Sequence, residues 1–357
     1  MENERTAGAT SPRKKLGTRA ITAITCVVSV LIALCVFLMI WYLGDDYPDF
    51  TRRFTKESAI PGLAEGFMPQ GAAEYDGTTY ISGYMADGSP SRIYAVDEDG
   101  EAIGYVTVKN DGGLYNGHAC GIATNGNRMW LVSDGTVYVL QHKDVKTQSA
   151  VNGTVEVSGT WNAHCNADFC YYDGTYFYVG EFYRKGNYET EESHRFETPA
   201  KDKNTALILR YSSTTGYENY QPSAVYPSRA YSITGEIQGM AMNEKGDRII
   251  LSQSYALKNS HLLVYSFSTS DTKYESNKLK INGTYVRMYY LDSANLVNDY
   301  EIPCMSEGLY SKGDRIYVLF ESAGKKYAPW VREHLDNIYS FLSLIHISEP
   351  TRLQLIS

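Results

Sequence analysis

Two histidines and a glutamate occupy equivalent places in three separate segments of the chain. His118, His164 and Glu236 each stand three residues before the small residue that opens a short apolar stretch. Two imidazoles and a carboxylate that converge on one point could bind a transition metal such as Zn²⁺ or Fe²⁺. No ligand motif of fixed spacing, such as HExxH, accompanies them. This metal hypothesis therefore requires a fold that brings three distant segments together.

A second polar set directly precedes the same small residues, and its members are Gln70, Cys120, Asn166, Gln238 and Glu307. Four of the five carry side-chain oxygens, which would suit Ca²⁺. The same side chains could instead read out an organic ligand, or line a water-filled channel and satisfy one another and ordered water. The polar lining requires least from the sequence, and a divalent ion remains a possible cofactor.

Other chemistries find less support. The chain has no GxSxG motif, and neither Cys120 beside His118 nor Cys165 beside His164 has an evident orienting acid. A glycosidase needs two carboxylates across a cleft, and the aligned positions offer only Glu236 and Glu307. The net charge of −8 comes from interspersed acids and bases, which excludes nucleic acid as a partner. Whether the protein is an enzyme stays open.

Five similar segments must position these residues. Each contains a small residue, a short apolar stretch, a glycine turn and then a strand rich in Tyr, Ile, Val or Trp. The 31 Tyr and 30 Gly among 357 residues fit strands joined by tight turns. The small residues are Gly71, Gly121, Ala167, Gly239 and Gly308, and the turn glycines are Gly77, Gly126, Gly174, Gly246 and Gly313.

A third strand follows in every unit, over residues 92–97, 136–141, 206–211, 262–267 and 337–341. A fourth is expected in four units, over residues 102–109, 154–159, 224–231 and 284–291. The last unit lacks a fourth strand in this sequence, so either truncation has removed it or residues 50–58 supply it and close the ring. Four-stranded units in tandem predict an all-β propeller.

This pattern resembles the β-propeller superfamily over about Gly66 to Phe341 and, more loosely, uncharacterised bacterial propellers that are membrane-anchored or secreted. The resemblance implies five blades, with six as the alternative if a weak blade lies in residues 211–235 or 267–301. It also implies that the first strand of each blade lines a central channel. The two polar sets, extended by Met68 and Met305, would then form two rings at the channel mouth. Resemblance of this kind implies a fold more than a function.

Long hairpins between second and third strands should open on the same face. The longest, residues 184–205, is either a functional loop or a solvated charged excursion. Nearby aromatic residues could line a sugar or peptide groove: Tyr183, Tyr188, Tyr327 and Trp330. Four cysteines outside the N-terminal apolar segment permit three full disulfide pairings, which the sequence leaves open: Cys120, Cys165, Cys170 and Cys304.

The apolar segment Ile21 to Leu43 carries no charge and would span about 34 Å as a helix at about 1.5 Å per residue, enough to cross a lipid bilayer. Basic residues precede it and acidic residues follow it, which predicts a cytoplasmic tail (1–20), a transmembrane helix (21–43), a linker (44–57) and an extracytoplasmic domain (58–341). A cleaved signal peptide, or a lipoprotein acylated at Cys26 or Cys35, are the alternatives.

The C-terminal stretch Leu342 to Arg352 (LSLIHISEPTR) resembles the in-frame translation of an adapter used in preparing DNA sequencing libraries. Residues 342–357 are therefore set aside as an artefactual tail.

Two functions follow from these expectations. The first is a membrane-tethered, extracytoplasmic propeller that binds an envelope polymer, a peptide or another protein. The alternative is a metal-dependent hydrolase or lactonase in which a channel ion polarises a carbonyl group or activates water.

Overall fold

The computed structural model describes residues 17–43, 47–212, 225–268 and 275–343. The chain divides into two units, Met1–Pro48 and Asp49–Ser357. The first unit contains helix α1 (Thr18–Leu43), whose side chains are described over residues 22–36. Among the described residues, no helix has both the length and the apolar character needed to cross a membrane. The basic residues at positions 13–15 lie outside the described residues.

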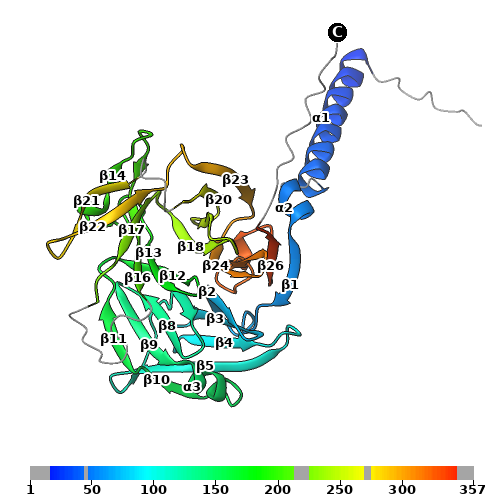
Figure 1. Ribbon diagram of the computed structural model, residues 1–357. Helices are drawn as coiled ribbons and strands as arrows, with labels where there is room; N and C mark the ends of the chain where they lie inside the picture. Colours follow the sequence, from blue (N-terminus) through cyan, green and yellow to red (C-terminus); the bar gives the residue numbers. More distant parts are fainter. Residues whose placement is uncertain (1–16, 44–46, 213–224, 269–274, 344–357) are drawn as a thin grey trace, which may run out of the picture. The chain divides into compact units, whose positions relative to one another are not determined.

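Five antiparallel blades are arranged in a ring in the second unit (Figure 1). Their inner strands are β2 (Phe67–Tyr75), β7 (Gly121–Thr124), β12 (Ala167–Tyr172), β18 (Ile237–Met242) and β24 (Ser306–Lys312). Each inner strand contacts the next in this order, and β24 contacts β2, which closes the ring. The prediction of an all-β propeller with five blades is confirmed, and the six-bladed alternative is wrong because strands from both suspected segments belong to the third and fourth blades.

The second and third strands of each blade follow the sequence repeat closely. The second strands are β3 (Thr78–Met85), β8 (Arg128–Ser133), β13 (Tyr176–Glu181), β19 (Arg248–Gln253) and β25 (Arg315–Phe320). The third strands are β4 (Arg92–Val96), β9 (Thr136–Gln141), β16 (Ala206–Ser212), β20 (Ser260–Ser266) and β26 (Asn337–Leu342). All five predicted turn glycines have positive φ, from +57° to +93°, as tight hairpins require.

The outer strands differ from the prediction in two blades. They are β5 (Ala102–Asn110), β11 (Gly159–Asn162), β17 (Arg229–Ile233), β23 (Leu296–Ile302) and β1 (Thr55–Ala59). Residues 154–159 and 284–291 were expected to be the outer strands of the second and fourth blades. They instead contain β10 (Thr154–Glu156) and β22 (Thr284–Tyr290), which pair in parallel with β5 and β17, the outer strands of the first and third blades. Strand β21 (Glu275–Ile281) then pairs with β22. Strands β10 and β22 therefore each cover a sheet edge that would otherwise be unpaired.

The N-terminal strand β1 pairs antiparallel with β26 and completes the fifth blade, as predicted from residues 50–58. The segment expected to be a linker up to residue 57 is partly folded. Helix α2 (Pro48–Arg53) buries Phe50, whose ring lies 5.9 Å from that of Phe320 and 5.1 Å from that of Tyr339. Because this aromatic side chain packs on the fifth blade, the folded unit begins before Ser58.

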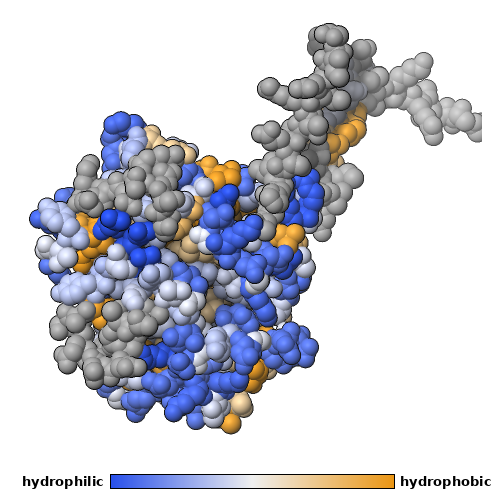
Figure 2. Space-filling model, viewed as in Figure 1, coloured by the Kyte–Doolittle hydropathy of each residue, from blue (hydrophilic) through white to orange (hydrophobic). Residues whose placement is uncertain are grey.

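Smaller elements occupy the connections. They are β6 (Gly113–Leu114), α3 (His142–Ser149), the 3₁₀ turn η1 (Glu192–His194), β14 (Phe196–Glu197), β15 (Lys203–Asn204) and the 3₁₀ turn η4 (Ala328–Trp330). Apolar side chains fill the spaces between blades, with Trp130, Tyr80 and Phe177 among the fully buried ones. The face of the molecule seen in Figure 2 is mostly hydrophilic, with small apolar patches.

The centre of the ring is packed so closely that it requires small residues. A Cβ atom on Gly71 would lie 2.8 Å from the Cα of Gly121, and one on Gly308 would lie 2.9 Å from the Cα of Gly71. The third blade meets this requirement differently, because Phe169 occupies the inner strand and the small residue, Gly180, stands opposite it on β13. This exchange changes the register of the polar residues in that blade.

Candidate central pocket

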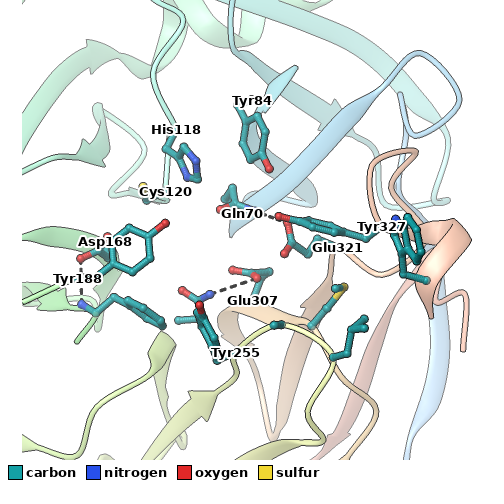
Figure 3. A pocket seen from close by; sticks show the side chains of 16 residues that line it. Gln70, Tyr84, His118, Cys120, Asp168, Tyr188, Tyr255, Glu307, Glu321 and Tyr327 are labelled. Atoms are coloured by element: carbon teal, nitrogen blue, oxygen red, sulfur yellow. Dashed lines mark hydrogen bonds between the residues drawn. The ribbon is translucent and has the colours of Figure 1, made fainter. Parts of the chain in front are cut away.

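A pocket of about 400 Å³ opens at the end of the ring where the inner strands begin (Figure 3). All five blades contribute side chains to its lining. Polar residues at the start of the inner strands form its floor, and aromatic residues at the ends of the second strands and in the loops that follow them form its rim.

Backbone irregularities aim the floor residues into the pocket. In four blades the inner strand shifts register near its start, around Gln70, Asp168, Gln238 and Glu307. A β-bulge of this kind re-aims a side chain away from the regular strand alternation. Cys120 directly precedes β7 and occupies the corresponding place in the second blade. All five side chains line the pocket.

Asp168 stands where Asn166 was expected. Ala167 is not the counterpart of Gly71 that the sequence repeat predicts, because Phe169 pairs with Gly180 just as Gly71 pairs with Ser82. Asn166 is exposed, and its side-chain amide donates a hydrogen bond to the carbonyl of Glu189 at 3.2 Å. The spacing to the turn glycine agrees with this assignment, because Asp168 stands six residues before Gly174, as Cys120 does before Gly126 and Glu307 before Gly313.

The three residues of the metal hypothesis do not meet. His118 lines the central pocket and stacks on Tyr84 with ring centroids 4.5 Å apart. His164 lines a separate pocket, where its Nε2 lies 2.9 Å from the carbonyl oxygen of Val225. Glu236 forms an ion pair with Arg184. Among the described residues, no group of three or more His, Cys, Asp or Glu side chains is arranged to hold a metal ion.

Backbone conformation explains this separation. Convergence of the three side chains requires extended backbone from the small residue of each blade back to His118, His164 and Glu236. In the structure His164, Glu236 and Met305 have φ values of +56°, +64° and +64°, so the chain has left the strand before it reaches them. Met305 still lines the pocket, and Met68 is fully buried outside its lining.

Two carboxyl groups of the fifth blade lie together on the floor. Glu321 directly follows β25, and its amide donates to the carbonyl of Met305 at 3.0 Å, which places it beside Glu307. Gln70 Nε2 donates to Glu321 Oε2 at 2.9 Å, and Gln238 Nε2 lies 3.4 Å from Glu307 Oε1. Only 2% of Glu307 and 9% of Glu321 is exposed.

Burial raises the pKa values of Glu307 and Glu321. Desolvation, followed by repulsion from Glu321, raises the pKa of Glu307 well above its ordinary value. Desolvation raises the pKa of Glu321 to about 7, although the hydrogen bond from Gln70 opposes the shift. The pair can therefore hold a proton between its two carboxyl groups near neutral pH.

A third acid, Asp168, lines the same pocket from the third blade. Desolvation raises the pKa of Asp168 to about 7, although its Oδ2 accepts a hydrogen bond from the amide of Phe182 at 2.9 Å. Among the ion pairs of the described residues, none includes Asp168, Glu307 or Glu321. The floor thus concentrates carboxyl groups without a contacting Lys or Arg. We call Asp168, Glu307 and Glu321 the floor acids.

Aromatic side chains surround the pocket mouth. The rim residues are Tyr84, Phe182, Tyr188, Tyr255, Tyr327 and Trp330. Trp330 is 73% exposed and Tyr188 is 53% exposed, so both can be contacted by a ligand without rearrangement. Tyr188, Tyr327 and Trp330 were among the expected groove residues, whereas Tyr183 instead lies against Arg195.

The rim rings already face cations of the protein itself. Lys326 Nζ lies 5.1 Å from the ring centroid of Tyr84 and 4.9 Å from that of Tyr327, and it donates to the Tyr84 hydroxyl at 2.9 Å. The guanidinium carbon of Arg184 lies 4.1 Å from the ring centroid of Tyr255. All three distances to ring centroids fall within the range of cation–π attraction.

The long loop 184–205 is anchored to the third blade. His194 Nδ1 lies 2.9 Å from Glu181 Oε1, and both side chains are almost fully buried. Desolvation lowers the pKa of His194, but the hydrogen bond and charge of Glu181 outweigh it and leave the pKa above its ordinary value. Within the same loop, Tyr188 pairs with Arg184 through backbone hydrogen bonds and lines the pocket.

The cysteines of the propeller are free thiols in the structure. Burial raises the pKa of Cys120 well above its ordinary value, and its sulfur lies 3.7 Å from the Ser133 hydroxyl. A protonated thiol is a poor nucleophile, so the pocket does not present an activated cysteine.

No family model and no curated protein matches this chain. Similar solved structures include Chaetomium thermophilum Sqt1 bound to the N-terminus of ribosomal protein L10, at 12% identity and a TM-score of 0.34 over 79% of this chain and 64% of that one. The chain thus spans less than two thirds of the Sqt1 chain.

Two further structures span more of their own length. One is the gluconolactonase XC5397 from Xanthomonas campestris, at 9% identity and a TM-score of 0.36, covering 83% of this chain and 92% of that one. The other comprises the RRP9 WD40 repeats, at 9% identity and a TM-score of 0.35, covering 81% and 97%. These likenesses are too distant to transfer a function. By the pairing of its own strands, the chain has the five-bladed β-propeller fold.

Proposed function

We propose that this chain is a membrane-tethered, extracytoplasmic propeller that binds a ligand of the cell envelope in its central pocket. The observation that carries the proposal is the combination of an aromatic rim with a hydrogen-bonding floor, drawn from all five blades into one cavity. A concave site with apolar walls and a few convergent polar groups is the usual form of a ligand pocket.

The floor acids argue against a lining that serves only to hold water. Neutral side chains such as Gln70 and Gln238 suffice to hydrate a channel, whereas buried carboxyl groups with raised pKa values cost folding stability. Groups perturbed in this way concentrate at functional sites. Their presence in a cleft therefore favours ligand recognition.

The tether is supported by the uncharged segment Ile21 to Leu43 and by the basic residues that precede it. A protease added to intact cells is expected to remove the propeller and leave the N-terminal tail protected. Survival of the propeller, under conditions that digest a known surface protein, would refute the external location.

Envelope polymers, peptides and proteins are the partner classes in this proposal. The alternative of a metal-dependent hydrolase or lactonase stays a prediction, and metal analysis of the purified protein is its test.

Trp330→Ala and Tyr188→Ala are expected to weaken ligand binding without loss of folding. Both side chains are exposed at the rim, so their removal takes away contact area for a ligand and little packing. Each aromatic contact contributes about 0.5 to 1.5 kcal/mol, which corresponds to roughly two- to tenfold in Kd.

The measurement is a thermal-shift screen of the full chain in detergent against envelope glycans and peptides, followed by titration of the hits. Tyr285→Ala provides a matched control, because Tyr285 is 63% exposed and lies outside the pocket lining. If hits bind all three variants as they bind the unaltered chain, the central pocket is not the binding site.

A further inference from the structure

We infer that the central pocket recognises its ligand through a protonated amino group, held between the aromatic rim and the carboxyl groups of the floor. This inference rests on the proposed binding function and names the chemical class of the ligand.

Charge is the first reason. The floor brings three acids into one cavity, and no Lys or Arg of the described residues forms an ion pair with any of them. Lys326 is exposed at the rim, where it donates to the Tyr84 hydroxyl, and its charge acts on Glu321 without forming an ion pair with it. Desolvation lowers the pKa of His118, which favours its neutral form. An ammonium group would supply the missing positive charge.

Hydrogen-bonding capacity is the second reason. The amide nitrogens of Gln70 and Gln238 are directed at Glu321 and Glu307, so the floor offers the ligand mainly oxygen acceptors. A protonated primary amine has three N–H donors and no acceptor. It therefore complements this floor better than a neutral hydroxyl group, which cannot offset the charge of an ionised carboxylate.

The aromatic rim is the third reason. Arg184 and Lys326 occupy the rings of Tyr84, Tyr255 and Tyr327. Tyr188 and Trp330 line the same pocket, are exposed, and have no Lys or Arg of the described residues over their rings, so their faces are available to a ligand cation. A ligand cation could thus contact aromatic rings at the pocket mouth and the floor acids deeper in the pocket, and both contacts are attractive.

The amine could belong to an amino sugar or to a basic peptide, and matched probes separate these sources. Calorimetric titration of the full chain in detergent would use glucosamine against N-acetylglucosamine, and Nα-acetyl-lysine amide against its Nε-acetylated counterpart. At least one amine is expected to bind ten or more times more tightly than its acetylated partner. The pair that shows the difference identifies the source.

Glu307→Gln and Glu321→Gln are expected to abolish this preference, because they keep the shape of the floor and remove its charge. Glu244→Gln serves as a control, because Glu244 is exposed and lies outside the pocket lining. A circular dichroism spectrum and thermal midpoint for each variant establish that it is folded.

The outcomes separate the inference from the proposed function. If acetylated probes bind as tightly as the amines and Trp330→Ala weakens both, the pocket is a binding site and the ammonium inference is wrong. If amines bind but Trp330→Ala and the floor variants leave the affinity unchanged, both the inference and the pocket assignment fail. Absence of binding by all four probes also overturns the inference.

Discussion

Replacing Glu321 with glutamine is expected to stabilise the propeller at pH 8. Because burial raises the pKa of Glu321 to about 7, its carboxyl group is protonated in the folded state at pH values where it is already ionised in the unfolded chain. The contribution of this group to the free energy of unfolding is fully present below about pH 4.5 and is lost as the pH rises to about 7. Glutamine does not ionise, so the free energy of unfolding of the variant should exceed that of the unaltered chain by about 1 to 3 kcal/mol at pH 8.

Thermal unfolding between pH 4 and pH 8 measures this effect. The unaltered chain should lose stability as the pH rises, and Glu321→Gln should flatten that decline. Asp168→Asn should act in the same direction, since the pKa of Asp168 is also raised to about 7. Glu244→Gln should leave the profile unchanged. A Glu321→Gln variant that is less stable than the unaltered chain at pH 8 would show that the floor acids are held as stable anions.

Replacing His194 with alanine is expected to destabilise the propeller by about 3 to 5 kcal/mol, the usual cost of removing one partner of a buried ion pair. The change leaves Glu181, which is 1% exposed, without its ring partner. Backbone amides of Leu207 and Asn166 still donate to its carboxylate, at 3.0 and 3.2 Å, so the lower end of this range is expected.

The pH dependence of this pair has a definite sign. The pKa of folded His194 lies above the unfolded value of 6.5, so its contribution is fully present below pH 6.5 and is lost as the pH rises through the folded pKa. The difference in melting temperature between His194→Ala and the unaltered chain should therefore shrink from pH 6 to pH 9. His261→Ala is a suitable control, because His261 pairs with Asp299 at a partly exposed site. Equal differences at both pH values would mean that folding does not shift the pKa of His194, which would contradict this account.

The sequence predicted the blades because each carries a local signal. The turn glycines and the alternating strands around them recur five times, and tight hairpins enforce both. The outer edges could not be predicted in the same way. Strands β10 and β22 pair in parallel with β5 and β17, and such pairing depends on contacts between distant segments that no repeat encodes.

The floor of the pocket was predicted at four of its five inner-strand positions: Gln70, Cys120, Gln238 and Glu307. The fifth was missed because Phe169 and Gly180 exchange the large and small residues between two strands. Glu321 was missed because it follows the second strand of its blade. The sequence could have predicted its position, because the end of the second strand lies beside the start of the first strand in an antiparallel hairpin. Phe320, which directly precedes Glu321, pairs with Ser306 in this way.

The number of protons exchanged on ligand binding tests the central claim most directly. A cation that enters the pocket lowers the pKa of Glu321 and Asp168, so binding below pH 7 must release protons to the solvent. Calorimetry at pH 6 in two buffers with different ionisation enthalpies measures this number. We predict net release with glucosamine or Nα-acetyl-lysine amide, reduced at pH 8.5 and in Glu321→Gln. Binding with no proton release at pH 6 would mean that the ligand does not reach the floor acids, and would contradict the account.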